Sequence, residues 1–272
     1  MRRIFAYSVI NKILRWAQDD SINSMSTIYI LWLRQIKRYY RSKSRLVGSL
    51  GQPVLFLVAL GFGFGPIFQK AGGGNYIQFL APGVIAMGIL FMAMFSGIEV
   101  IWDRQFGFLK ETMVAPVSRI NIMIGRTLGG ATVAVMQGVI IFLITLLVGF
   151  KPVYGMNLLL AAVFMALIAI LFTALGTAIA SVLEDFHGFQ LIMNLLVQPL
   201  FFLSGALFPI SGLPEVITVI VKANPLAYGV DGIRATLVNT AHLGISMDLM
   251  VLSAVTIVFV AIGSYLFSKI EI

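Results

Sequence analysis

The sequence predicts an all-α, polytopic membrane protein with six transmembrane helices. Hydrophobic residues make up 59% of the 272-residue chain and charged residues only 11%, whereas about 25% of a soluble domain is charged. Uncharged runs such as Tyr76–Ile98 and Thr127–Phe150 have the ~20-residue length that a helix needs to cross a bilayer. Short Gly-rich, Pro-containing or polar segments separate most of the runs. The spans are expected at about 46–68, 77–100, 125–149, 157–182, 189–209 and 248–268.

The composition excludes several kinds of site. The chain has no cysteine, which excludes disulfides and thiolate metal ligands, and its two histidines are too few for a histidine-based metal cluster. No GxxxxGK[ST] motif occurs, so the chain cannot bind ATP through a P-loop of its own. We therefore expect neither an enzyme nor a bound cofactor. The net charge of +8 is typical of positive cytoplasmic loops, and no nucleic-acid partner is expected.

The distribution of Lys and Arg predicts the orientation. With the N-terminus in the cytoplasm, 15 of the 19 basic residues fall in cytoplasmic segments and 4 fall outside. Such a bias indicates a multi-pass protein of the cell membrane (plasma or inner membrane) with both termini in the cytoplasm. We expect a cytoplasmic tail over residues 1–24 and a six-span domain over 46–272.

Residues 25–45 are predicted to form an amphipathic helix at the membrane surface. Basic residues recur at i, i+3, i+4 and i+7, and an apolar face lies opposite. We favour an anchor to anionic membrane lipids, and a lever that also contacts a cytoplasmic partner is the alternative. The basic face comprises Arg34, Lys37, Arg38 and Arg41, and the apolar face comprises Ile28, Trp32, Ile36 and Tyr39.

A charged segment, Trp102–Arg126, lies between the second and third spans and must sit in water at the bilayer surface. Residues 103–114 are predicted to form one short helix that Pro116 terminates. On such a helix Phe106, Leu109 and Met113 share a face, and Arg104 and Glu111 lie on another. The helix is either a membrane anchor or a plug into a groove on a soluble protein.

Few polar residues fall within the spans. Glu99 ends the second span; we favour a wetted or ion-paired carboxylate at the membrane edge, and a gate or a proton-coupling residue is the alternative. The amides within spans are interpreted mainly as hydrogen-bonding links between helices, and a polar path is the alternative. They are Gln52, Gln137, Asn194 and Gln198. The glycines of Gly61–Gly65 and Gly125–Gly129 are typical of close helix packing or of local flexibility.

Residues 210–240 are predicted to form an external re-entrant hairpin before the sixth span. The segment is too long and apolar for an ordinary loop, yet prolines and charges interrupt it. Two short helices are expected at 214–221 and 225–238, with Pro225 in the first turn of the second. Half-helices of this kind are tolerated only where protein buries their ends.

Several motifs in order give the chain a family resemblance. Arg104–Glu111 (RQFGFLKE), Ala115–Arg119 (APVSR) and Ile124–Arg126 (IGR) resemble the first cytoplasmic loop of permease subunits of type-two ATP-binding-cassette exporters. That loop usually reads R-x-x-G-T-L-E-x-L-x-x-x-P followed by G-R; here Phe108 replaces Thr and Lys110 replaces Glu. Asn224–Tyr228 (NPLAY) is similar to the family's N-P-L-x-Y segment, with Asp231 and Arg234 following.

The resemblance covers about residues 26–270 and implies a function. Members form homodimers or pseudo-dimers, or pair with a paralogue, and bind separately encoded nucleotide-binding ATPase subunits, where ATP and Mg²⁺ act. This chain would then form the translocation path for an amphipathic, lipid-like or glycan substrate. The alternative is an ion-coupled secondary carrier that uses Glu99. The implied partner-coupling residues are Arg104, Phe106, Gly107, Leu109, Lys110, Glu111 and Pro116, and the implied external motif is Asn224, Pro225, Tyr228 and Arg234.

Overall fold

The computed structural model describes residues 24–72, 74–114, 117–153, 157–183, 185–210 and 212–270, and this part of the chain is α-helical with no strand. The predicted tail falls on residues 1–23, outside the described residues. The helices are α2 (Ser24–Arg41), α3 (Lys43–Lys70), α4 (Tyr76–Ser96), α5 (Ile98–Gln105), α6 (Phe108–Val114), α7 (Arg119–Val148), α8 (Leu158–Val182), α9 (Phe186–Phe202), α10 (Glu215–Ala223), α11 (Pro225–Val238) and α12 (Ile245–Ser268).

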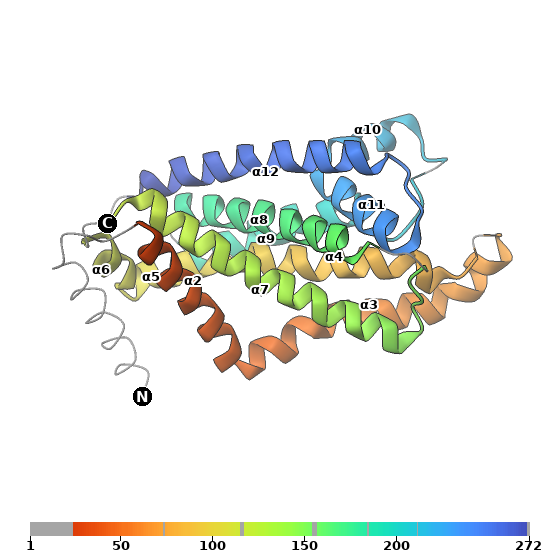
Figure 1. Ribbon diagram of the computed structural model, residues 1–272, viewed down its shortest axis with the longest axis horizontal. Coiled ribbons are helices and arrows are strands. Elements are labelled where there is room, and N and C mark those ends of the chain that lie inside the picture. Colours follow the sequence, from red (N-terminus) through yellow and green to blue (C-terminus); the bar gives the residue numbers. More distant parts are fainter. Residues whose placement is uncertain are drawn as a thin grey trace.

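The helices form an elongated bundle with two distinct ends (Figure 1). One end, called the α6 end, carries the start of α2, helices α5 and α6, and the last turns of α12. The opposite end, called the α11 end, carries the α3–α4 turn with α10 and α11. Among the described residues, five helical segments are long and apolar enough to cross a bilayer, or six if the bent pair α10–α11 counts as one. The predicted all-α membrane fold is confirmed.

Helix α4 occupies the centre of the bundle. It packs against α3, α7, α8, α9 and α11, and 83% of the most apolar part of the α4–α5 span is buried, against 17% for α3 and α12. Close packing depends on small residues: a Cβ on Gly97 would lie 2.3 Å from the carbonyl oxygen of Gly176 on α8. The outer faces of α3 and α12 are covered with exposed apolar side chains, as expected of helices that border lipid.

The predicted fifth span is shorter than expected. Helix α9 has 17 residues, or about 25 Å, which is less than the ~30 Å hydrocarbon core. Residues 203–210 continue as turns, because Gly205 adopts a positive φ of 71° that ends the helical path. The chain still passes from end to end here. Phe186 stacks on Trp102 of α5, and the carbonyl of Leu207 accepts a hydrogen bond from Tyr76 at the start of α4.

The predicted single helix over residues 103–114 is wrong. Helix α5 continues the second span to Gln105, and Gly107 then takes a left-handed conformation with φ of 78° before α6 begins at Phe108. Only glycine adopts that conformation without strain, so the chain turns at this point. The break changes which side chains of the segment face outward.

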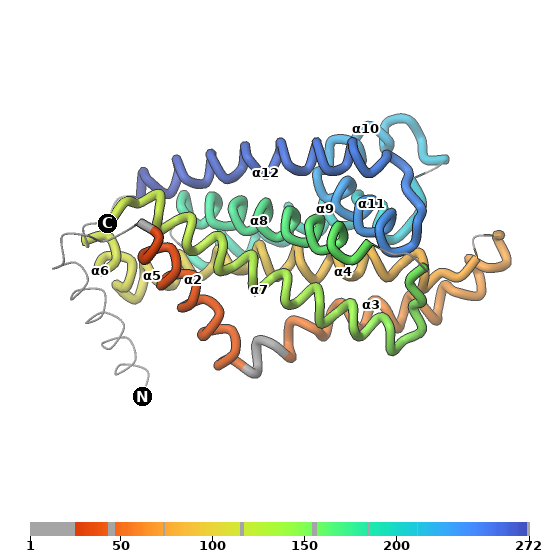
Figure 2. The backbone as a smooth tube through the Cα atoms, in the orientation of Figure 1, coloured from red at the N-terminus to blue at the C-terminus, as the bar shows by residue number. Residues whose placement is uncertain are grey.

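Helix α2 packs lengthwise along the first half of α7, as Figure 2 shows. A Cβ on Gly125 would lie 3.0 Å from the carbonyl oxygen of Ile28, and one on Gly129 would lie 2.7 Å from the side chain of Gln35. The interpretation of these two glycines as packing positions is confirmed. The buried row of α2 is Leu31, Gln35 and Tyr39.

Candidate functional site

Charged side chains from three helices meet at the α6 end. Asp103 on α5 accepts hydrogen bonds from both terminal nitrogens of Arg34 on α2, at 3.1 and 2.9 Å, and it also pairs with Arg126 on α7. Arg38 on α2 lies 3.5 Å from Glu99 and 3.8 Å from Asp103. We call these five residues the arginine–carboxylate cluster; three arginines in it face two carboxylates.

The cluster is largely withdrawn from water. Glu99, Asp103 and Arg126 are 4%, 5% and 3% exposed. Burial lowers the pKa of Arg34 to about 10, an effect that the negative charge of Glu99 opposes, so Arg34 is still a cation at neutral pH. Removing one member of such a group costs about 3–5 kcal/mol, because the remaining charge is left buried without compensation.

The cluster changes the interpretation of α2 and of Glu99. Arg34 and Arg38 were expected to face lipid with the rest of the basic face, yet they turn toward carboxylates of α5, whereas Lys37 and Arg41 are exposed. Glu99 lies beside Arg38, in agreement with the ion-paired interpretation. A role for Glu99 as a gate stays a prediction.

A cation–π contact attaches α6 to α2. The guanidinium group of Arg34 lies 3.7 Å from the centre of the Phe108 ring, the first residue of α6. Contacts of this geometry contribute about 0.5–2 kcal/mol. Since Arg34 also binds Asp103 on α5, one side chain connects α2, α5 and α6.

Arg104 faces inward rather than toward a partner. Its Nη2 donates to the carbonyl of Ser181 at 3.1 Å and its Nη1 to the carbonyl of Leu183 at 3.3 Å, both at the C-terminal end of α8. The carbonyl groups in the last turn of a helix accept no hydrogen bond from the helix itself, so a cationic side chain is a favourable donor to them. Arg104 therefore fixes α5 to α8, which corrects its expected place on the outer surface.

The outer surface of α6 differs from the expected one. Leu109 is fully buried, so the expectation that it fills a groove on a partner is wrong. The turn at Gly107 rotates α6 relative to α5 and directs Leu109 into the core. Phe106 and Val114 are 83% and 85% exposed. With the exposed side chains of Lys110 and Glu111 they form what we call the α6 patch. Pro116 lies outside the described residues.

The predicted external motif organises the α11 end. Pro225 is the first residue of α11, and the Asn224 side chain caps this helix by accepting from the Leu226 N–H at 3.0 Å. The Asn224 amide also donates to the carbonyls of Leu200 and Leu203, at 2.6 and 3.0 Å. Helices α10 and α11 meet at an angle of 85°. Asn224 thus joins this bend to the end of α9.

Two further side chains of the motif close the same region. The Tyr228 hydroxyl donates to the carbonyl of Lys222 at 2.8 Å, across the bend. Arg234, only 2% exposed, donates to the carbonyls of Gly205 at 2.9 Å and Phe79 at 3.4 Å, and lies 4.2 Å from the Phe79 ring centre. These contacts hold α9, α4 and α11 together, so all four motif residues have structural contacts within this end.

Four cluster residues were not among the candidates predicted from the sequence: Arg34, Arg38, Asp103 and Arg126. A signal was present, because Arg34 and Arg38 are four residues apart on one helix and Glu99 and Asp103 are four apart on another. Such spacing places two like charges on one helix face. Complementary pairs on two helices favour an interhelical contact, although the spacing alone does not identify the partner helix.

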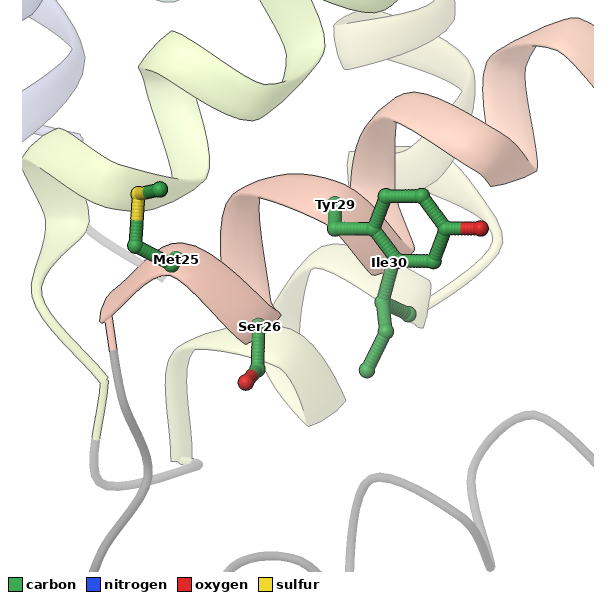
Figure 3. A pocket seen from close by; sticks show the side chains of 4 residues that line it. All are labelled: Met25, Ser26, Tyr29 and Ile30. Atoms are coloured by element: carbon green, nitrogen blue, oxygen red, sulfur yellow. The ribbon is translucent and has the colours of Figure 1, made fainter.

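The described residues hold no candidate metal site, and a hollow at the start of α2 is lined by uncharged side chains. They contain no group of three or more His, Cys, Asp or Glu side chains that could hold a metal. A hollow of about 310 Å³ lies at the first two turns of α2, lined by Met25, Ser26, Tyr29 and Ile30 (Figure 3). Among these four described residues the polar side-chain groups are the hydroxyls of Ser26 and Tyr29, and none of the four is charged.

Comparison with known proteins identifies the family. Residues 26–238 match the family described as "ABC-2 type transporter". The chain belongs to the ABC-2 type transporter family. It is 29% identical to Nodulation protein J of Rhizobium leguminosarum bv. trifolii, over 79% of this chain and 84% of that protein. It is 28% identical to the putative transport permease ycf38 of Cyanophora paradoxa, over 94% of each chain.

Membership of the ABC-2 family confirms the resemblance drawn from the sequence motifs. The matched region extends from α2 through α11, so it includes the arginine–carboxylate cluster, α6 and the external motif. The ABC-2 chain is a multi-pass membrane transport subunit.

Proposed function

We propose that the chain is the membrane-spanning subunit of an ATP-driven exporter, in which separate nucleotide-binding subunits bind α6 and move it when they hydrolyse ATP. The α6 patch is the observation that carries this proposal. It offers two exposed apolar side chains, Phe106 and Val114, on either side of the charged residues Lys110 and Glu111. Apolar anchors with flanking charges are typical of a helix that docks into a groove on another protein.

The contacts behind the patch give a route for force. Leu109 anchors α6 in the core, and Phe108 lies under Arg34, which is bound to Asp103. A push on the patch would therefore move α2 and α5 together. Because α5 directly follows α4 in the chain, the central helix α4 would move with it. The same contacts explain why α6 would act as a rigid lever and not as a loose loop.

The translocation path is proposed to run along α9, between two copies of the chain or between this chain and a paralogue. Gln190, Asn194 and Gln198 recur every four residues on α9, and Asn194 is exposed. An exposed amide is costly in hydrocarbon, which favours a path or a protein interface over lipid. Gln137 differs, because it is buried and accepts from Tyr39 and Ser49. Hydroxyl-rich glycans and the head groups of amphipathic lipids match amide hydrogen bonding.

In this arrangement the α6 end lies at the cytoplasmic side of a plasma or inner membrane. The bias of basic residues toward cytoplasmic segments supports that orientation. The exposed Lys37 and Arg41 would then lie near anionic lipid head groups. ATP and Mg²⁺ would bind in the partner subunits.

Co-purification with the nucleotide-binding subunits tests the proposal. Phe106→Ala should weaken their binding at least about tenfold, as expected for an aromatic anchor at an interface. Thermal stability should not change, because the ring is 83% exposed. Val216→Ala is the matched control, since Val216 is 73% exposed on α10 at the opposite end.

Two outcomes would count against the proposal. If the nucleotide-binding subunits bind the Phe106→Ala variant as tightly as the Val216→Ala variant, the α6 patch is excluded as the docking surface. Transport in proteoliposomes without any ATPase subunit, driven by an ion gradient, would instead favour the secondary carrier.

A further inference from the structure

Two buried carboxyl groups meet at the α11 end. Asp231 on α11 and Asp248 in the first turn of α12 are both 0% exposed. Helix α11 packs against α12, and Asp231 binds the backbone of the loop that leads into α12, so the two carboxyl groups lie close enough to interact. Neither residue takes part in the coupling site. An ionisable group buried within a membrane protein is costly, so its charge state needs an explanation.

Asp231 has the donors that an ionised carboxylate requires. Its two oxygens accept from the backbone N–H of His242, at 3.1 and 2.9 Å, and one oxygen also accepts from the N–H of Leu243 at 2.8 Å. Arg234, one turn along α11, is an electrostatic partner of opposite charge. Three charge-assisted hydrogen bonds and a nearby cation stabilise the anion.

Asp248 lacks such donors. Neither of its oxygens has a hydrogen-bond donor among the described residues. A second negative charge here would face Asp231 without compensation. If Asp248 carries a proton, its hydroxyl becomes a donor and the Asp231 carboxylate is the acceptor beside it. One proton thus converts a repulsive pair into a hydrogen bond.

We propose that Asp231 and Asp248 form a one-proton binding site, in which a proton on Asp248 holds α11 and the following loop against α12. The residues around the pair favour a proton over a metal cation. Arg234 already supplies positive charge, and the described residues provide no third carboxylate or histidine ligand. The elements packed on α11 and α12 carry few ionisable groups: α8 has none, α4 has Tyr76, and α10 has Glu215 and Lys222. Helix α7 has Arg119 and Arg126, both in its first turns at the α6 end.

The proposal predicts a direction for the pH dependence of stability. The folded protein would hold one proton that the unfolded chain releases above the ordinary range of an aspartic acid. Between that range and the pH at which the folded pair loses its proton, stability must fall as pH rises, by up to about tenfold in the folded-to-unfolded ratio per pH unit; at higher pH the pair adds no further pH dependence. The side chain of His242, whose backbone N–H binds Asp231, is exposed.

Thermal unfolding of the full-length chain in lipid nanodiscs from about pH 5 to about pH 8 tests this direction. The unfolding midpoint of the wild type should fall across the range. Asp248→Asn should stay folded with a much weaker dependence, because its amide donates to Asp231 without a titrating proton. Asp185→Asn is the control, since Asp185 is exposed at the α6 end and asparagine also caps a helix. An equal pH dependence in Asp248→Asn and the wild type would overturn the proposal.

Infrared spectroscopy of the folded wild type gives a second test that does not depend on unfolding or on a variant that folds. At about pH 6 most exposed carboxyl groups are already ionised, so a carbonyl stretch of a protonated carboxyl that shifts in D₂O would report Asp248. Asp248→Asn should remove this band and Asp185→Asn should retain it. A wild-type spectrum without the band would overturn the proposal.

Discussion

Replacing Asp103 with asparagine tests the arginine–carboxylate cluster most directly. The substitution keeps the shape of the side chain and removes its negative charge. Asp103 binds Arg34 through two hydrogen bonds and pairs with Arg126. Arg126, which is 3% exposed, would be left as a buried cation whose remaining nearby charges are mainly arginines. An asparagine oxygen still accepts one hydrogen bond, but it does not neutralise a guanidinium group.

The magnitude follows from burial. Breaking a buried ion pair by removing one partner costs about 3–5 kcal/mol. At about 2–4 °C per kcal/mol for a chain of this size, the unfolding midpoint should fall by about 6–20 °C. The loss of the Arg34 bonds should also loosen α6, since Arg34 no longer has a fixed position over Phe108.

Fluorescence-detected size-exclusion chromatography after heating measures the shift in detergent. Asp185→Asn is the control, because its carboxylate is exposed and the same change should move the midpoint by about 1 °C or less. The double variant Asp103→Asn, Arg126→Met should recover part of the loss, since the uncompensated cation is gone. A midpoint for Asp103→Asn within about 2 °C of the wild type would refute the reasoning.

Three other substitutions test the packing of the bundle by the same assay. Asn224→Ala should destabilise the protein more than Asn157→Ala does. Both substitutions remove a helix cap worth about 1 kcal/mol, but only Asn224 also donates a hydrogen bond to α9. Equal shifts of the unfolding midpoint would contradict the role of Asn224 at the bend. Gly129→Val should cost about 1–3 kcal/mol by overpacking α2 against α7, whereas Gly63→Ala, with open space around it, should be neutral or stabilising; unchanged stability of Gly129→Val would exclude the close contact. Arg234→Lys should still lower the free energy of unfolding by about 1–3 kcal/mol, because one ammonium group cannot replace both the several donors of the guanidinium group and its stacking on Phe79. An unchanged stability would show that the positive charge alone suffices.

The local pattern of the sequence predicted most of the fold. Uncharged runs of membrane length predicted the positions of α3, α4, α7, α8 and α12, since a helix satisfies its own backbone polar groups and needs only an apolar surface. The bend near Asn224 was also predictable, because Pro225 suits only the first turn of a helix. The end of α9 was not, because a positive φ at Gly205 depends on the contacts around it.

The function of individual charged residues depended on tertiary structure. Arg104 and Leu109 were expected on a partner-facing surface, but the turn at Gly107 and the carbonyls of α8 direct both of them inward. Asp103 lies 69 residues from Arg34 in the sequence, and no local sequence pattern marks Asp248 as a neighbour of Asp231. The sequence alone determined the membrane class, the spans and the family motifs, because these follow from hydrophobicity and local spacing. Only the three-dimensional arrangement decided which charges are paired, which are exposed and which must share a proton, because electrostatic interactions depend on distance and burial that no local pattern contains.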